Sequence, residues 1–380
     1  MSNTFRIRIL CIGLLLLTTL TVFSQVKKNS LKLPAIKGYE LLKCDFHMHT
    51  VFSDGSVWPT VRVTEAFQEG LDAISITDHI EYKPKSDDFT TKDQLRPFQI
   101  AEKLAKESGI ILIKGTEITR KTPPGHFNVI FVKDANIFET FVNKTDSRDG
   151  SNIAETLVEA KKQGAFVFWN HPWFQHPENR SEWQKIHEEL YRKGLISGIE
   201  IANGNRYDPI VFQWCLDKNL TILSNSDSHT PMNIQPGHYR TMTLVLAKER
   251  SEKGVREALS NHRTIAYMEG QLFGKEEWVK SLIDNSLIIK ARQINDKSAT
   301  LEIENMSGIA YKMEVVNDSG FNLRLSSRLN EFTIDALSEY AIMVSSPKIN
   351  KGQEYSVTLK VLNVQVSPDK PLEYTLKFKF

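Results

Sequence analysis

The 380-residue sequence contains only three cysteines, at positions 11, 44 and 215. Three cysteines cannot build the disulfide framework on which many small secreted domains depend. Cys44 and Cys215 lie in apolar contexts that are typical of buried thiols. We therefore expect stability to come from a large hydrophobic core, which a chain of this length can form without covalent cross-links.

An excess of charge of one sign is also lacking, since 48 Lys and Arg residues against 46 Asp and Glu residues leave a net charge of +2. A large nucleic-acid-binding face normally requires a basic excess, so we expect no stable nucleic-acid partner. Solenoid-type repeats and low-complexity segments are absent from the sequence. No Gly-rich phosphate loop follows an expected strand, which argues against a nucleotide-binding Rossmann fold.

The N-terminus carries the pattern of a secretory signal peptide. Two arginines precede an apolar run over residues 9–23, and small residues place a cleavage site after Ser24. The run is short for a membrane span, and Cys11 precedes its centre rather than following it, as a lipoprotein signal would require. We expect residues 1–24 to be removed from a secreted or periplasmic protein without a membrane span; the alternative is an uncleaved anchor.

Between residues 40 and 270, short apolar runs alternate with amphipathic segments, which predicts a parallel α/β sheet in a single domain. The expected strands cover residues 41–46, 73–77, 110–114, 127–132, 165–169, 198–201 and 220–224. The expected helices cover residues 59–70, 92–108, 153–163, 180–193 and 209–218, several of them ending at glycine. Seven such strands could close into a barrel or remain an open, doubly wound sheet.

Metal-binding side chains lie at or beside one end of nearly every expected strand. The candidate ligands are His47, His49, Asp54, His79, Glu117, His126, His171, Asp227 and His229. His47 and His49 project to the same side because alternate residues of a strand do so. Carboxyl ends of barrel strands meet at one mouth, so the recurrence of ligands there favours a barrel over scattered surface histidines.

The mixture of histidines and carboxylates suits zinc, manganese or iron, and nine donors are too many for one ion. We therefore expect two to three divalent ions, with Glu117 as a bridging ligand. Their charge would exceed that of the three carboxylates, which favours an anionic phosphoester as the small substrate. Adjacent ions clamp phosphate oxygens and lower the pKa of a bridging water, so that a hydroxide attacks phosphorus.

The motifs resemble those of the polymerase and histidinol phosphatase (PHP) family over about residues 40 to 270. They are Asp45-Phe46-His47-Met48-His49 with Ser53-Asp54-Gly55, Thr77-Asp78-His79, Glu117, His126, Asn170-His171-Pro172 and Ser226-Asp227-Ser228-His229. The resemblance implies a distorted (β/α)7 barrel with a trinuclear metal site. Together, the signal peptide and a C-terminal sandwich look most like the exported Sb-PDE-type phosphodiesterases of that family.

The resemblance also implies how the ligands are shared. One ion would be held by His47, His49, Glu117 and Asp227. A second would share Glu117 and add His126 and His171, and a third would take Asp54, His79 and His229.

Three further residues are candidates for catalytic roles. Arg206, after the sixth expected strand, could grip a phosphate oxygen, or could be a surface arginine. His238, shortly after the last ligand pair, could protonate a leaving alkoxide, or could be structural. Asp78 could orient a neighbouring ligand.

The pattern of apolar and polar residues changes after residue 270. Residues 271–285 read as a connector, and alternating residues with turn signals over 286–380 predict a small antiparallel β-sandwich for packing or partner binding. The function expected from the whole sequence is an exported metal-dependent phosphodiesterase. The alternatives are a phosphomonoesterase of the same family, a metal-dependent amidohydrolase, or a non-catalytic extracellular binding protein.

Overall fold

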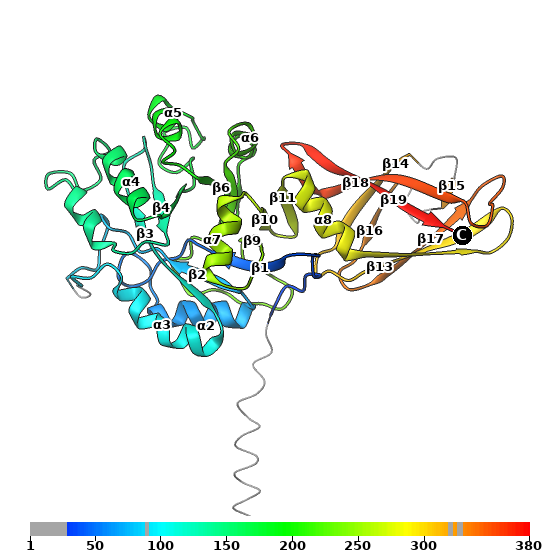
Figure 1. The fold of residues 1–380 in the computed structure, drawn as a ribbon, viewed down its shortest axis with the longest axis horizontal. Coiled ribbons are helices and arrows are strands. Elements are labelled where there is room, and N and C mark those ends of the chain that lie inside the picture. The colour runs from blue at the N-terminus through cyan, green and yellow to red at the C-terminus, as the bar shows by residue number, and fades with distance from the viewer. Residues whose placement is uncertain (1–28, 88–90, 318–321, 325–329) are drawn as a thin grey trace, which may run out of the picture.

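The computed structural model describes residues 29–87, 91–317, 322–324 and 330–380. The expected signal peptide and Cys11 lie outside these residues. An α/β part and an elongated all-β part lie side by side, and the C-terminus lies in the all-β part (Figure 1). None of the helices in the described ranges is long and apolar enough to cross a membrane. Cys44 and Cys215 are buried free thiols, as their apolar contexts predicted.

Seven strands form the wall of the α/β part. They are β1 (Glu40–Asp45), β2 (Ala73–Ile76), β3 (Ile111–Ile118), β4 (Phe127–Ile130), β5 (Phe166–Trp169), β6 (Gly198–Asn203) and β8 (Thr221–Asn225). Strands β1, β2 and β3 pair in parallel, and so do β5, β6 and β8. The ring closes beyond β8, where Asp227 N donates to His47 O at 2.9 Å and His49 N donates to Ser228 O at 3.0 Å.

Helices and short elements connect these strands. They are α2 (Pro59–Glu69), α3 (Arg96–Ser108), the 3-10 helix η1 (Asn136–Phe141), α4 (Ile153–Lys162), α5 (Lys185–Arg192), β7 (Arg206–Tyr207) and α6 (Pro209–Asp217); a further helix, α7 (Glu252–Ser260), follows the seven strands. Helix α2 ends at Gly70, whose φ of 67° lies in the left-handed region that glycine adopts without strain. The glycine punctuation of the sequence thus predicted this helix end correctly.

Strand β4 departs from the parallel arrangement expected for the sheet, because it pairs antiparallel with both β3 and β5. The physical reason is the connection from β3, which holds only residues 119–126 and no crossover helix, so the chain must return antiparallel. The reversal has a consequence for the site. His126, just before β4, lies on the same side of the barrel as the residues that follow the parallel strands.

Beyond the ring, the sheet continues into the C-terminal part. Strands β9 (Met242–Ala247), β10 (Thr264–Met268) and β11 (Gln271–Gly274) pair antiparallel in turn, starting from β1. Strand β11 then pairs in parallel with β18, with Leu272 opposite Val364. The predicted connector over 271–285 therefore contains a sheet strand, β11, and most of helix α8 (Glu276–Ser286).

The C-terminal part is a sandwich of two antiparallel sheets. Its strands are β12 (Leu287–Gln293), β13 (Ser298–Asn305), β14 (Tyr311–Asn317), β15 (Asn322–Arg324), β16 (Glu331–Ile334), β17 (Glu339–Ser345), β18 (Glu354–Ser367) and β19 (Lys370–Lys379). Every second residue of β13 is buried, the pattern of a strand with one face in the core. One apolar cluster joins Leu244 and Leu272 to Tyr311 and Leu359, so the two parts share a continuous core.

Candidate metal centre

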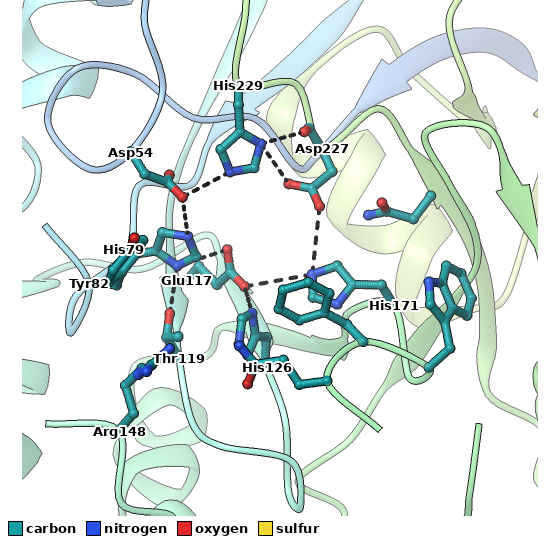
Figure 2. Close-up of a pocket in the computed structure, with 14 residues that line it drawn as sticks. Asp54, His79, Tyr82, Glu117, Thr119, His126, Arg148, His171, Asp227 and His229 are labelled. Atoms are coloured by element: carbon teal, nitrogen blue, oxygen red, sulfur yellow. Dashed lines mark hydrogen bonds and ion pairs between the residues drawn. The ribbon is translucent and has the colours of Figure 1, made fainter. Parts of the chain in front are cut away.

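The nine side chains expected to bind metal converge at one mouth of the barrel. Seven of them, all except His47 and His49, line the hollow that Figure 2 shows. The ligand atoms of all nine side chains form four overlapping groups, and within each group the atoms lie within 4.8 Å of one another. The groups are His49, Asp54, His79 and His229; His47, His171 and Asp227; His47, His49 and Glu117; and His79, Glu117 and His126. The residues come from six segments of the chain, and only the closed ring brings them together.

Glu117, at the end of β3, lies at the centre of these groups. Its Oε2 is 3.2 Å from His47 Nε2 and 3.3 Å from His49 Nε2. Its Oε1 is 2.8 Å from His126 Nδ1. The side chain is fully buried, and its two oxygens face different histidines. This geometry suits the bridging role expected for Glu117 from the sequence.

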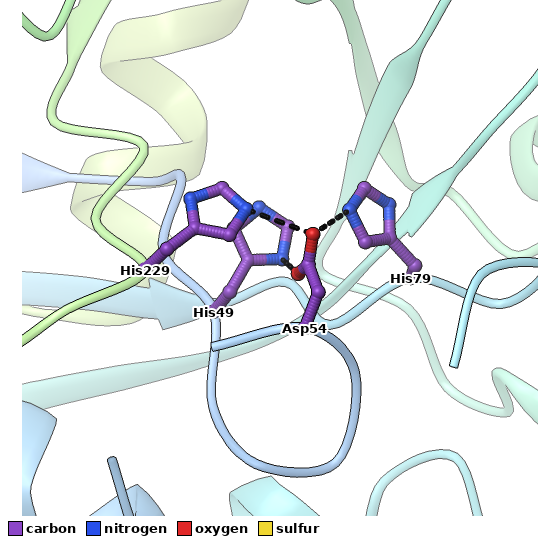
Figure 3. Close-up of side chains that lie close together, drawn as sticks. All are labelled: His49, Asp54, His79 and His229. Carbon is purple, nitrogen blue, oxygen red and sulfur yellow. Dashed lines mark ion pairs between the residues drawn. The ribbon is translucent and has the colours of Figure 1, made fainter. Parts of the chain in front are cut away.

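Asp54 contacts three histidines at the mouth of the barrel. Its Oδ2 lies 3.5 Å from His79 Nε2 and 3.2 Å from His229 Nε2, and its Oδ1 lies 3.7 Å from His49 Nδ1 (Figure 3). The resemblance assigned His49 to a different ion from these three residues. In the structure the ring of His49 lies between the two sets, since its other nitrogen, Nε2, is 3.1 Å from Asp227 Oδ1.

Opposite charges hold the centre together electrostatically. Burial disfavours the imidazolium of His49, but the nearby carboxylates of Asp227 and Glu117 outweigh this and raise its pKa to about 10. Burial also disfavours the Glu117 carboxylate, yet the His79 and His47 imidazoles hold its pKa well below the usual range. His171, by contrast, has its pKa lowered by burial to about 4. The neighbouring imidazoles thus favour the ionised form of the buried Glu117 carboxylate.

The donor set fits divalent metal ions. Several buried polar atoms at the mouth have no hydrogen-bond partner, namely Glu117 Oε1, both ring nitrogens of His126, and Asp227 Oδ1. His126 Nδ1 and Glu117 Oε1 are close in space, but their orientation does not make a hydrogen bond. Buried donors and acceptors rarely remain unpaired unless a ligand completes them. Imidazole nitrogens and carboxylate oxygens at these separations are suitable ligands for such ions.

Two hollows adjoin the centre. The larger, of about 440 Å³, has ligand residues on its floor and Tyr82, Arg148, Trp173 and Phe174 among its lining. The smaller, of about 370 Å³, is lined by residues that include Ser226, Tyr239 and Thr241. Asp227 and His229 line both hollows. These two residues therefore form a common border of the two hollows.

A solved structure of a related protein identifies the family. This chain is 41% identical in sequence to a two-domain protein from Bacteroides vulgatus that contains a predicted PHP-like metal-dependent phosphoesterase, and the crystal structure of that protein superposes with a TM-score of 0.83. The match covers 93% of this chain and 99% of the other. The chain belongs to the PHP-like metal-dependent phosphoesterases. The predicted family and the predicted fold class, a PHP barrel followed by an all-β domain, are thereby confirmed.

Two further similarities concern parts of this PHP-like phosphoesterase. Residues 287–377 match the family model of an Ig-like domain, DUF5001, which agrees with the β-sandwich. Over 199 residues the chain is 36% identical to the uncharacterized protein MJ1295 of Methanocaldococcus jannaschii. That alignment covers 51% of this chain and 84% of the archaeal protein.

Sequence reasoning missed one residue of the phosphoesterase centre, Glu200 in β6. Its Oε1 lies 2.8 Å from His47 Nδ1, and its Oε2 accepts hydrogen bonds from His171 N at 3.0 Å and from the Asn203 amide at 2.9 Å. Glu200 is fully buried. A charged residue between Ile199 and Ile201 in an apolar strand was the signal that could have revealed it.

Asp78 supports the ligands from behind. Its carboxylate accepts hydrogen bonds from Thr50 N at 2.7 Å, Thr50 Oγ1 at 2.6 Å and Ser53 Oγ at 2.6 Å. These bonds hold the turn between His49 and Asp54. Asp78 lines neither hollow, and its contacts fit the orienting role considered for it.

Arg206 and His238 do not join the centre. The Arg206 guanidinium donates to Asn179 Oδ1 at 2.6 Å and lies 4.7 Å from the ring centroid of Trp173. His238 is exposed, and neither residue lines the two hollows. The cation that does line the larger hollow is Arg148, in the loop before α4, a position that no strand end signals. The loops around Arg206 and His238 take directions that the sequence pattern did not reveal.

Proposed function

We propose that this PHP-like phosphoesterase is an exported phosphodiesterase. The observation that carries the proposal is the pair of hollows that share Asp227 and His229. A phosphodiester has two organic arms on one phosphorus, whereas a monoester has one. A phosphate over the shared residues would direct one arm into each hollow. A monoester would leave one hollow unused.

Different residues of this chain would bind the metal ions, orient a ligand and attract the phosphate. Divalent ions held by the histidines and carboxylates of the mouth would neutralise phosphate charge and activate a water molecule. Glu200 keeps Nε2 of His47 directed at the mouth by contacting its Nδ1. Arg148 supplies a fixed positive charge in the lining of the larger hollow and attracts an anionic substrate. Manganese, zinc and iron all suit this donor set.

Export is the second element of the proposal. It is supported by the arginines, the apolar run and the cleavage pattern of residues 1–24. A combination of export and a C-terminal sandwich is also the basis of the resemblance to Sb-PDE-type phosphodiesterases. Expression of the full chain in a Gram-negative host, followed by fractionation, should yield a periplasmic protein that begins at Gln25. Retention of residues 1–24 in the membrane fraction would contradict cleavage and favour the uncleaved anchor, and recovery of the protein in the cytoplasm would contradict export.

The catalytic part is tested with two chromogenic esters on manganese- and zinc-loaded protein. Bis(p-nitrophenyl) phosphate should be hydrolysed faster than p-nitrophenyl phosphate, and His47→Ala should abolish the activity. His262→Asn serves as the matched control, because His262 contacts Thr221 on the side away from the mouth. Asparagine also tolerates the φ of 56° at that position.

Each outcome has a defined meaning. Hydrolysis of the monoester alone would replace the diesterase assignment with a phosphomonoesterase. Loss of activity in both histidine variants would mean that general destabilisation, and not the mouth, explains the result. Hydrolysis of neither ester by metal-loaded protein would contradict the proposed specificity and favour an amidohydrolase or a binding protein.

A further inference from the structure

The larger hollow exposes aromatic side chains to an unusual extent. Tyr82 is 42% exposed and Phe174 is 44% exposed, and both line the hollow. Among the described residues, the other aromatic side chain with comparable exposure is Trp58, which is outside the lining. Exposed apolar surface gathered at one concave place marks a binding site more often than scattered exposure does.

Contacts with ligand histidines fix the two rings. The Phe174 ring meets His126 and His171 edge-on, at centroid distances of 5.3 and 5.1 Å. The Tyr82 ring meets His79 edge-on at 5.8 Å, and the Arg148 guanidinium carbon lies 5.7 Å from the Tyr82 centroid. The rings are therefore held beside the candidate metal centre, while more than two-fifths of the surface of each residue remains exposed.

Among the described residues, the apolar lining of this hollow is aromatic. Its apolar members are Tyr82, Trp173 and Phe174, and no Val, Leu, Ile or Met of the described part of the chain lines it. An aliphatic chain is usually bound by aliphatic side chains that adapt to its shape. Rigid aromatic walls favour a planar ring, because offset-stacked and edge-to-face contacts add to simple burial. The smaller hollow differs, since Met232 contributes to its lining.

We propose that the larger hollow binds a planar aromatic ring carried by one arm of the ester substrate, in contact with Tyr82 and Phe174. This inference rests on the proposed function, because it assigns the chemistry of one arm of the phosphodiester. Arg148 beside Tyr82 adds a positive charge that favours an electron-rich ring, or one with hydrogen-bond acceptors at its edge. A volume of about 440 Å³ suffices for such an arm.

The test compares two anions that have no ester bond and so cannot be hydrolysed. Diphenylphosphinate and dicyclohexylphosphinate carry the same tetrahedral anion and six-carbon rings, but only the first has planar rings. Calorimetric titration into manganese-loaded full-length protein should give a Kd for diphenylphosphinate that is roughly tenfold lower, the effect of about one stacking contact. Phe174→Leu and Tyr82→Leu should each reduce this preference toward equality.

Leucine keeps apolar volume at both positions, so loss of the preference reports the ring and not the mere loss of a wall. Phe98→Leu is the matched control, because Phe98 lies in α3 and does not line the hollow, and it should preserve the preference. Thermal unfolding of each variant checks that the protein is folded. Equal Kd values for the two anions in the unmodified protein, or a preference that neither Leu variant reduces, would overturn the inference.

The two proposals can fail separately. A planar-ring preference without turnover of bis(p-nitrophenyl) phosphate would contradict the diesterase and keep the ring-binding hollow. Diester turnover with equal Kd values would support the diesterase and remove the assignment of its arm.

Discussion

Glu200 Oε1 lies 2.8 Å from His47 Nδ1, and both side chains are fully buried. The contact leaves Nε2 of His47 directed at the centre, 3.1 Å from His49 Nε2 and 3.2 Å from Glu117 Oε2. A carboxylate behind a ligating histidine fixes its tautomer and ring orientation and increases its basicity. Glu200 also binds His171 N, so one carboxylate aligns two candidate ligands from separate strands.

Glu200→Gln should weaken metal binding by about tenfold to a hundredfold, since the neutral amide supports His47 less well. The measurement is a titration of apo-protein with Mn²⁺ or Zn²⁺, followed by calorimetry. Glu102→Gln, an exposed change in α3, is the control and should leave the affinity unaltered. An unchanged affinity in Glu200→Gln would show that the contact with His47 does not tune the ligand.

Arg148→Gln should raise the KM for bis(p-nitrophenyl) phosphate about tenfold, with a smaller change in kcat, which corresponds to about 1.4 kcal/mol of binding energy. Among the described residues, Arg148 is the one Lys or Arg that lines the larger hollow, and it forms no ion pair with a described carboxylate. Steady-state kinetics in low salt provide the measurement. Arg292→Gln, on the exposed face of β12, is the control. A fall in kcat alone would contradict a role in substrate binding.

Gly55→Ala should reduce both stability and activity. An added Cβ would lie 2.5 Å from the carbonyl carbon of His49 and 2.6 Å from Thr50 N, and this backbone cannot yield without moving Asp54. Overpacking of this kind costs about 1–3 kcal/mol. Thermal unfolding and ester hydrolysis are measured together. Gly109→Ala, with a φ of 70° but open space around it, should lower stability while specific activity is retained. Full activity in Gly55→Ala would contradict this account of the turn.

His187 should make the fold sensitive to mild acid. Its ring stacks on Trp169 at a centroid distance of 3.9 Å, and its Nε2 lies 2.9 Å from Pro124 O. Burial lowers its pKa from 6.5 to about 4, so the folded state holds the imidazole neutral. The unfolded chain binds the proton first as the pH falls, and stability contributed by the neutral ring is present above pH 6.5 and is lost toward pH 4.

The expected loss from this group is on the order of 3 kcal/mol across that window. His187→Gln removes the titrating ring, so the Tm difference between the two proteins should narrow as the pH falls from 7 to 4. Because other groups titrate equally in both proteins, the difference isolates His187. Parallel Tm curves would contradict the assignment.

Much of the metal centre could be predicted from the sequence, because strand periodicity is a local property. His47 and His49 share one side of a strand end, and the other candidates recur at the same phase of the strand-helix pattern. The same pattern predicted the barrel. His126 fitted less well as a residue before its strand, and the antiparallel direction of β4 explains its position.

The other residues around the metal centre could not be predicted from the sequence, because contacts between distant segments position them. Glu200 belongs to none of the ligand motifs in the sequence. The pairing of β6 with its neighbouring strands brings it to His47. Arg148 lies in a loop and Arg206 in the short strand β7, and their directions depend on tertiary contacts such as that between Arg206 and Asn179. No local pattern distinguished the arginine that enters the hollow from the one that does not.

The sequence by itself determined the residue types of the centre, the order of the strands that carry them and the nature of the C-terminal part, since each follows from the period and punctuation of short segments. Only the tertiary structure decided which atoms face each other, which cation lines the larger hollow, and that two hollows share Asp227 and His229. The physical reason is that side-chain direction along a strand is set within a few residues, whereas distances between loops are set by ring closure and packing.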